Sequence, residues 1–412
     1  MLKNVSRRQF LEAAGAVAAG VALVGCSSDE DTTEETSDDT EEESDDTTEE
    51  ESTASTGDIL IGIMGPYTGD VSQYGINTRN GAMLYLDAYN EAGGVNGKTV
   101  NYEYEDEKGD ATEAVTVYNK LVEDGVTGII GDVTSTPSIA VAQISVEDNM
   151  PMVTPSGTGD AITTYGSNFF RACVTDSYQG VALAQFCQSE GITSVATLYN
   201  SESDYEVGIN ETFVANAADY GITITSENGY PADTKDFSAY ITTIIADGAE
   251  AILAPNYYEE VGLQVTAARA AGFTGAIMGA DGWDGVQNGY ADAEDLENTY
   301  YTSAYFNVDS TEDEVVSFVS DYEAAYDDTP NLFSALGYDA AMILVAGLEG
   351  AEAQGLEPGS DDYKQAIIDT ISTCEVEGLT GTITFSGTGD PSKGLTVFTF
   401  VDGVTEQYMV VG

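Results

Sequence analysis

The chain has 412 residues, in which 72 aspartates and glutamates stand against 12 lysines and arginines, so its formal net charge at pH 7 is −60. It contains no histidine, which excludes Ser-His-Asp and Cys-His catalysis and every histidine-liganded metal site. So acidic a chain has little with which to neutralise phosphates, and this excludes nucleic acid as a partner.

The N-terminal residues have the pattern of an export signal. Arg7 and Arg8 precede a short apolar run, 13–24, which is too rich in alanine and glycine to span a bilayer permanently. Paired arginines indicate the twin-arginine (Tat) route, which carries folded proteins. The segment 23–26, Leu-Val-Gly-Cys, resembles the lipobox of exported lipoproteins, in which the cysteine is lipidated and becomes the new N-terminus. A plain signal peptide with an incidental Cys26 is the alternative.

Residues 27–56 consist almost entirely of serine, threonine, aspartate and glutamate, with 15 acidic residues and no lysine or arginine. Such a segment has nothing to bury and repels itself, so it cannot offset the entropy of ordering. Fully extended it could reach roughly 100 Å, at about 3.3–3.6 Å per residue. We interpret it as a flexible leash, with an acidic interaction tail as the alternative. Residues 1–26 are then a Tat signal peptide with a lipobox, and a lipid on Cys26 anchors the protein at the extracellular face of the cell membrane.

The remaining segment, 57–412, is longer than a domain built around a single hydrophobic core usually is. Two lobes are therefore expected. This part still carries 56 acidic residues against nine basic ones. Such a charge would strain a compact fold at low ionic strength, but at molar salt the Debye length falls to ~3 Å and the repulsion largely disappears. The acidity therefore indicates a halophilic protein of a hypersaline exterior and says little about a ligand.

The folded part alternates short apolar strands with longer helices. Strands are predicted at 58–64, 100–104, 127–130, 151–154, 194–199, 223–227, 251–254 and 276–279. Helices are predicted at 80–90, 111–123, 139–147, 179–190, 205–220, 237–247 and 261–271. This alternation specifies parallel sheets covered by helices on both faces. Two successive runs predict an α/β fold of two doubly wound parallel-sheet lobes, in which ligands bind beyond the carboxyl ends of the strands.

The segments that follow the strands hold the candidate site. In the first run they are rich in glycine, serine and threonine, at 65–75, 131–136 and 154–158. In the second run they carry aromatic residues and one carboxylate, at 200–205, 256–258 and 279–283. Hydroxyl and backbone donors suit a ligand carboxylate, and Asp281 suits an ammonium group, so the pattern indicates a small zwitterion. Taken singly, a serine or threonine after a strand is more often a helix cap.

Several runs of the chain match one known pattern: 93–98 (Gly-Gly-Val-Asn-Gly-Lys), 104–106 and 110–115, with further matches at 69–75, 154–158, 235–237 and 268–272. In these runs the chain resembles the Leu/Ile/Val-binding protein family, the type 1 periplasmic solute-binding proteins of ABC transporters. The resemblance extends in order over residues 58–411. It implies an amino-acid ligand and, as partners, the permease and ATPase subunits of an ABC importer.

The resemblance also implies two lobes joined by a three-segment hinge, with a ligand cleft that closes on binding. The first lobe would comprise 57–174 and 304–379, and the second lobe 175–303 and 380–412. The three crossings would fall near Cys173–Thr175, Thr302–Tyr305 and Leu379–Thr382.

Roles for individual residues follow from the same resemblance. Ser135 and Thr158 are similar to the hydroxyls that hold the α-carboxylate of the ligand, helped by backbone groups at Ser156 and Gly157. Asp281 lies where the family places a carboxylate for the α-ammonium group, although branched-chain members have glutamate there. The shorter arm requires a shift of the ligand or the backbone.

Five further residues are implied to surround the ligand. Tyr205 and Tyr257 match tyrosines of the second lobe that close over it. Tyr74, Val133 and Trp283 lie where groups that contact the ligand side chain are found. Members of the family bind branched aliphatic, aromatic and acyclic amide ligands, so the identity of that side chain stays open.

The positions of the cysteines differ from those in some members of the family. Members with a first-lobe disulfide have cysteines near Lys108 and Thr134, where this chain has none, so that bridge is absent. Cys173, Cys187 and Cys374 form an odd set without C-x-x-C spacing. One disulfide and buried free thiols are both compatible with this pattern.

Three classes of function are compatible with these features. The first is a lipid-anchored solute receptor that delivers a small amino acid, branched-chain or otherwise apolar, to a permease; an amide or urea-type solute is the variant. The second is a ligand-sensing module of the same fold. The third is an extracellular enzyme with Asp281 and Asp284 as acid and base, although so acidic a chain produces such pairs by chance. We favour the first and expect no catalytic residue, metal or cofactor.

Overall fold

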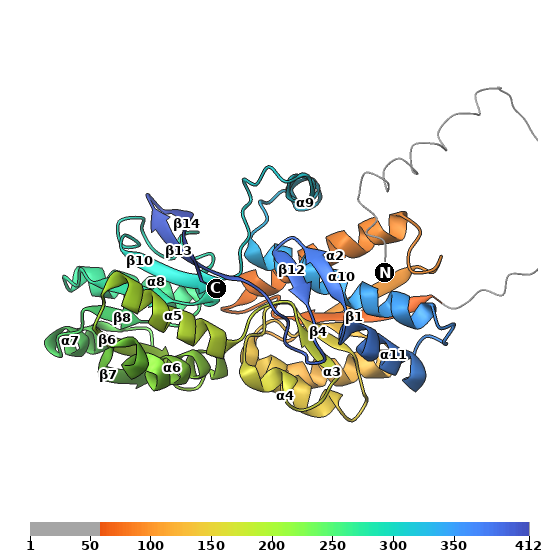
Figure 1. The fold of residues 1–412 in the computed structure, drawn as a ribbon, viewed down its shortest axis with the longest axis horizontal. Coiled ribbons are helices and arrows are strands. Elements are labelled where there is room, and N and C mark those ends of the chain that lie inside the picture. Colours follow the sequence, from red (N-terminus) through yellow and green to blue (C-terminus); the bar gives the residue numbers. More distant parts are fainter. Residues whose placement is uncertain (1–57, 412) are drawn as a thin grey trace, which may run out of the picture. The chain divides into compact units, whose positions relative to one another are not determined.

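The computed structural model describes residues 58–411 of the chain (Figure 1). The predicted signal peptide, the lipidation site Cys26 and the acidic segment fall in residues 1–57, which lie outside the described residues, as does Gly412. The strands of the described part form two large sheets and one small hairpin.

The first large sheet has five strands, all parallel, in the order β2-β1-β3-β4-β5. They are β1 (Ile59–Gly65), β2 (Val100–Asp106), β3 (Ile129–Ile130), β4 (Met152–Thr154) and β5 (Phe169–Arg171). Helices of the same part are α2 (Ser72–Glu91), α3 (Ala111–Asp124) and α4 (Ser135–Ser145). β1, β3, β4 and β5 are short and largely buried runs, as expected for a parallel sheet with helices on both faces.

The second large sheet has seven strands in the order β14-β13-β10-β9-β8-β6-β7. They are β6 (Ser194–Asn200), β7 (Thr223–Tyr230), β8 (Ala251–Leu253), β9 (Ala276–Gly279), β10 (Thr299–Ser303), β13 (Leu395–Val401) and β14 (Val404–Val411). Strands β6 to β10 are parallel, whereas β13 runs antiparallel to both β10 and β14, so this sheet is mixed. Asp402 and Gly403 join β13 to β14 with positive φ at both residues, the geometry that an Asp-Gly pair favours in a two-residue hairpin.

Helices cover both faces of the second sheet, which is therefore doubly wound as predicted. α5 (Asp176–Glu190) and α6 (Asp204–Ala217) pack on one face, and α7 (Ser238–Ala246) and α8 (Tyr258–Ala270) pack on the other. All seven predicted helices are present. Several begin earlier than predicted, most of all α2 at Ser72 and α4 at Ser135, so Tyr74 and Ser135 belong to helices rather than to loops.

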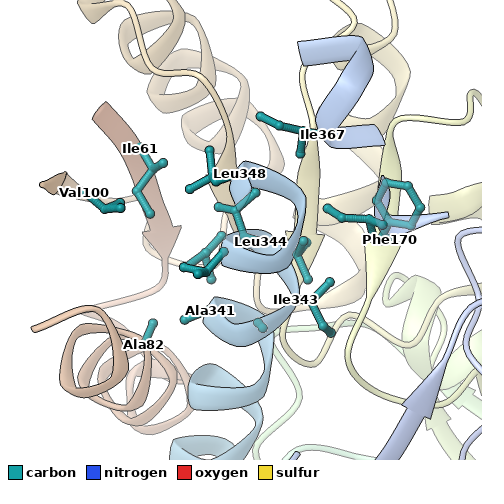
Figure 2. Close-up of a cluster of buried hydrophobic side chains, with 14 of the residues drawn as sticks. Ile61, Ala82, Val100, Phe170, Ala341, Ile343, Leu344, Leu348 and Ile367 are labelled. Carbon is teal, nitrogen blue, oxygen red and sulfur yellow. The ribbon is translucent and has the colours of Figure 1, made fainter. Parts of the chain in front are cut away.

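The last part of the chain adds elements to the first sheet. They are α9 (Asp313–Tyr326), α10 (Leu332–Glu352), α11 (Asp361–Ile371) and the hairpin strands β11 (Glu375–Gly378) and β12 (Gly381–Thr384). Figure 2 shows α10 at the centre of the largest apolar cluster, where its Leu344 lies among Ile61, Ala82, Phe170 and Ile367. By length and composition α10 could cross a membrane, but 83% of its most apolar window is buried inside the protein. Here it is a core helix.

Two glycines allow α10 to lie against α2. A Cβ atom added at Gly81 would lie 1.8 Å from the carbonyl oxygen of Ser334, and one at Gly337 would lie 2.0 Å from that of Thr78. The two backbones therefore touch at these positions, and any larger residue would force the helices apart. This close approach fixes the start of α10, which reaches the candidate site.

The chain passes between the two sheets three times. β5 ends at Arg171 in the first sheet and α5 begins at Asp176 on the second, while β10 ends at Ser303 before α10 returns. The family resemblance implies passages near Cys173–Thr175 and Thr302–Tyr305, and these two passages run through the same stretches of the chain.

The third passage lies later than the predicted 379–382, so assigning residues from 380 onward to the second lobe is wrong at its start. Ile383 and Phe385 are buried in the core around α10, and the backbone N–H of Arg171 donates to the Gly389 carbonyl at 3.1 Å. The apolar face of β12 keeps this segment on the first sheet. The chain joins the second sheet only at Leu395.

The cysteines of the described part are all free. Cys173 and Cys187 are buried and Cys374 is half-buried. Of the two readings that the sequence left open, free thiols are the one found. Burial raises the pKa of each thiol, to about 12 for Cys173 and Cys187 and to about 11 for Cys374, so they stay protonated at neutral pH.

Candidate functional site

A cavity lies between residues that follow strands of the two sheets, where the topology predicts ligand binding. It holds about 220 Å³ of empty space, part of it open to solvent. Its lining consists of Tyr74, Val133, Thr134, Ser135, Ser156, Thr158, Tyr205, Tyr257, Asp281, Gly282 and Phe333. Eight of the ten ligand-binding residues that the sequence predicts are in this set; Gly157 and Trp283 are not.

One wall of the cavity carries hydroxyl groups at a helix N-terminus. Ser135 is the first residue of α4, and its Oγ lies 3.4 Å from Oγ1 of Thr158. The Ser135 Oγ accepts from the N–H of Gly159 at 3.0 Å, so its own proton is directed either at Thr158 or at a further acceptor. Ser156 differs, because its hydroxyl donates to the Val133 carbonyl at 2.8 Å. With the positive end of the α4 dipole beside it, this wall suits an anion such as a carboxylate.

The loop that carries Thr158 is held from behind by Arg171. The Arg171 guanidinium is fully buried and donates to the carbonyls of Gly157 at 2.9 Å and Gly159 at 3.0 Å, and to Asp390 at 2.7 Å. The N–H of Gly157 in turn donates to the Thr154 hydroxyl at 2.7 Å. Both backbone groups of Gly157 therefore have protein partners in this structure, and Gly157 is not among the lining residues.

The opposite wall carries Asp281, which is 6% exposed. Its Oδ1 accepts from the Gln179 amide at 2.8 Å and from the Tyr205 hydroxyl at 3.0 Å. The Tyr205 hydroxyl also accepts from the N–H of Gly282 at 2.8 Å. Burial raises the pKa of Asp281 to about 6, and the hydrogen bonds from Gln179 and Tyr205 oppose part of that rise. The group is thus a carboxylate at neutral pH that would gain from a cationic partner.

Aromatic rings complete the lining. Tyr205 and Tyr257 stack with centroids 4.9 Å apart and planes within 8°, and Tyr74 and Phe333 lie 4.3 Å apart. The Tyr74 hydroxyl donates to the Gly282 carbonyl at 2.5 Å and accepts from the N–H of Tyr258 at 3.2 Å. Because α2 belongs to the first sheet and Gly282 to the second, these contacts join the two sides across the cavity.

Trp283 does not line the cavity, although the resemblance places it among the groups that contact the ligand side chain. The side chain is fully buried in the core of the second sheet, where its ring stacks against Tyr301 and its Nε1 donates to the Ala254 carbonyl at 2.8 Å. Gly279 leaves the room for it, since a Cβ there would lie 1.8 Å from the indole nitrogen. Asp284 is also outside the lining, so the carboxylate pair of the enzyme hypothesis does not share the cavity.

Thr134, Gly282 and Phe333 were missed by the sequence analysis. Thr134 and Gly282 adjoin predicted residues, but Phe333 lies some 200 positions from the first-run strand ends. A signal was present, because Asn331 and Ser334 form a capping box, with the Ser334 N–H donating to Oδ1 of Asn331 at 3.1 Å. This capping box predicts that a helix starts at 331, but it does not predict that the start of the helix lies at the cavity.

The chain is similar to several characterised proteins. The Leu/Ile/Val-binding protein homolog 3 of Brucella melitensis is 28% identical over 354 residues, which cover 85% of this chain and 94% of that protein. The leucine-, isoleucine-, valine-, threonine- and alanine-binding protein of Pseudomonas aeruginosa is 27% identical over 81% of this chain and 87% of its own length.

Solved structures show the same likeness. The branched-chain amino acid transporter substrate-binding protein LivJ of Streptococcus pneumoniae, in complex with isoleucine, matches with a TM-score of 0.78 and 28% identity. The alignment covers 86% of this chain and 99% of LivJ. The leucine-binding protein LivK of Thermotoga maritima matches equally well, with a TM-score of 0.78 and 28% identity over 86% of this chain and 98% of its own.

Two family models match the chain. Residues 4–24 match the twin-arginine translocation pathway signal sequence, which confirms the predicted export route and indicates a location outside the cytoplasm. The second model is that of the periplasmic binding proteins and matches residues 58–404, nearly the whole folded part. On the strength of that match and of the two-sheet architecture, the chain belongs to the periplasmic binding protein family.

Proposed function

We propose that this protein is the lipid-anchored, extracytoplasmic solute-binding component of an ABC importer and that it binds a small apolar α-amino acid. One observation carries the proposal: a single cavity has a buried carboxylate, Asp281, on one wall and the hydroxyls of Ser135 and Thr158 at a helix N-terminus on the other.

The two walls match the charges of a zwitterion. Asp281 would accept hydrogen bonds from an α-ammonium group through Oδ2, because both side-chain donors that contact it, Gln179 and Tyr205, reach Oδ1. Ser135 and Thr158 would donate to the α-carboxylate, with the N-terminus of α4 behind them. A ligand that lacks either charged group would leave one of these polar walls desolvated and unpaired.

The remaining surface favours an aliphatic side chain. The hydroxyls of Tyr74 and Tyr205 are both engaged by protein groups, so these rings offer the ligand carbon rather than a donor. Val133 and Phe333 add further apolar surface. The binding of isoleucine by LivJ and of branched-chain amino acids by the other relatives supports the same side-chain class. An amide side chain would find no free hydroxyl on the two engaged tyrosines.

Binding would close the two sides over the ligand. The passages between the sheets would act as the hinge, with first-lobe residues 57–174 and 304 to about 393 moving against the rest. The closed form would then be presented to permease and ATPase partners. The lipid on Cys26 and the acidic leash would keep the protein near that permease at the extracellular face of the membrane, in the high salt that its net charge indicates.

A thermal-shift screen of the twenty amino acids tests the ligand assignment. A ligand at 100 times its dissociation constant adds about 2.7 kcal/mol of stability, which is a readily measured shift in melting temperature. We expect leucine, isoleucine or valine to give the largest shift, and phenylalanine and glutamine to give smaller ones. A larger shift in melting temperature with an aromatic or amide amino acid would contradict the proposed aliphatic side chain. If no amino acid shifted the melting temperature, the proposal of amino-acid binding would be refuted.

A further inference from the structure

Gln179 occupies a buried position between the ammonium wall of the cavity and strand β10. It lies in the first turn of α5, is fully buried, and is not among the residues that line the cavity. Its Nε2 donates to Oδ1 of Asp281 at 2.8 Å, and its Oε1 accepts from the backbone N–H of Asp281 at 3.2 Å. The same Oε1 accepts from the hydroxyl of Thr302 at 3.1 Å.

The pairing with Asp281 is reciprocal, which fixes the orientation of the amide. An ionised carboxylate only accepts and a backbone N–H only donates, so only one of the two amide orientations satisfies both groups of Asp281. Thr302 then completes the two acceptor positions of Oε1. The side chain of Asp281 and its backbone are therefore held together by one buried residue on a different helix.

We propose that Gln179 is a positioning residue, which holds Asp281 ionised and in the orientation that receives the ligand ammonium group and links it to β10 through Thr302. The inference rests on the proposed function, because it assigns Gln179 a part in amino-acid binding without any contact with the ligand. Thr302 lies one residue before the end of β10, where the chain leaves the second sheet. The ammonium site is thereby tied to a strand that leads into the hinge.

The proposal predicts a pH signature. A donor to the ionised carboxylate favours ionisation, so removal of the Gln179 amide should raise the pKa at which binding is lost. Six titratable groups lie near enough to act on Asp281 or to sense its charge: Cys173 and Asp176 from the first passage and α5, Tyr205 from α6, Tyr74 from α2, Tyr257, and Asp284. The substitution changes none of these six.

The experiment compares Gln179→Met with Thr302→Val by calorimetric titration of L-leucine between pH 5.5 and 9. Methionine keeps the length and flexibility of the side chain and removes both polar ends. We expect Gln179→Met to weaken leucine binding roughly 10- to 100-fold at pH 7, since a hydrogen bond to a charged group is lost. The ratio to the unmodified protein should be larger at pH 6 than at pH 9. Thr302→Val, which leaves the contacts to Asp281 intact, should keep the original pH profile.

A loss of affinity by the same factor at every pH would show a structural role only and would overturn the proposal, as would unchanged affinity. If Gln179→Met does not fold, Gln179→Ala, which leaves room for water, should show the same pH trend with a smaller amplitude. A ratio of leucine affinities that stays constant with pH in Gln179→Ala would also overturn the proposal. Failure of the unmodified protein to bind any amino acid would instead refute the proposed function.

Discussion

The hydroxyl of Tyr74 lies 2.5 Å from the carbonyl oxygen of Gly282, and this hydrogen bond joins helix α2 of the first sheet to the residue that follows Asp281 on the second. The same hydroxyl accepts from the N–H of Tyr258. One side chain thus satisfies two backbone groups across the cavity. These groups would reach water if the two sides separated, so the contact contributes to the closed arrangement.

Tyr74→Phe should therefore weaken ligand binding while leaving the fold intact. In the closed form the substitution leaves the Gly282 carbonyl and the Tyr258 N–H without their partner, at a cost of about 1–3 kcal/mol, or roughly 5- to 150-fold in affinity. Titration calorimetry with L-leucine measures the loss. An affinity equal to that of the unmodified protein would show that this contact does not contribute to closure.

Stability should fall as the pH rises above neutral, because a buried pair of acids follows strands β2 and β3 of the first sheet. Glu107 and Asp132 are both fully buried. Burial and the neighbouring Asp132 raise the pKa of Glu107 far above its usual range, and burial raises the pKa of Asp132 as well. The folded state therefore binds protons that the unfolded state has released above about pH 4–5, and this stability is lost as the pH passes the folded pKa values.

Glu107→Gln isolates that contribution. The amide has nearly the same shape and cannot ionise, so the variant should unfold at a less pH-dependent midpoint than the unmodified protein between pH 7 and 10. Denaturant unfolding at several pH values, at constant salt, measures both slopes. Equal slopes for the two proteins would mean that Glu107 does not hold its proton in the folded state.

The high negative charge predicts a requirement for salt. Residues 57–412 carry 56 acidic and nine basic side chains, and their mutual repulsion is screened only at high ionic strength. We expect the melting temperature to fall steeply when monovalent salt is lowered from about 3 M to 0.1 M, where the Debye length grows from a few Å to about 10 Å. A melting temperature that stays constant over this range would contradict adaptation to a saline exterior.

The proposed lipid anchor can be tested at Cys26. Cys26→Ser should prevent lipidation and release the folded part into the medium, because the single apolar run of the signal is too short to hold it in a bilayer. Fractionation of cells after a salt wash, with immunodetection of the protein, distinguishes the two locations. A Cys26→Ser variant that remains with the membrane would refute the lipoprotein assignment.

Much of the fold is predictable from the sequence, because the buried strands of parallel α/β units are short apolar runs that alternate with longer helices. The eight predicted strands and seven predicted helices between residues 58 and 279 are all present. Beyond 280 the pattern is weaker, since β13 and β14 belong to an antiparallel hairpin and α10 is buried along most of its length. The third passage was placed too early because the burial of Ile383 against α10 is a tertiary contact.

The candidate site is predictable in position but not in every contact. The side chains at strand ends, such as Ser135 and Asp281, meet because the topology brings those ends together. Which way a side chain turns is decided by competing partners: Trp283 points into the core, where it finds the Ala254 carbonyl, and the N–H of Gly157 is taken by Thr154. Phe333 enters through the contact between α10 and α2, which no local pattern reveals.

Amino-acid binding in this cavity depends on the proposed pairing of Asp281 with the ligand ammonium group, and one titration tests that pairing most directly. L-leucine is titrated into the unmodified protein, into Asp281→Ala and into the matched control Asp284→Asn, which alters the same turn outside the cavity lining. Loss of one partner of a buried, hydrogen-bonded charge pair typically costs about 2–5 kcal/mol, so Asp281→Ala should bind leucine roughly 30- to 5,000-fold more weakly with little change in melting temperature. The control should stay within about threefold of the unmodified protein. Unchanged leucine affinity in Asp281→Ala, with a lowered melting temperature, would show that Asp281 only organises its turn and would contradict the account.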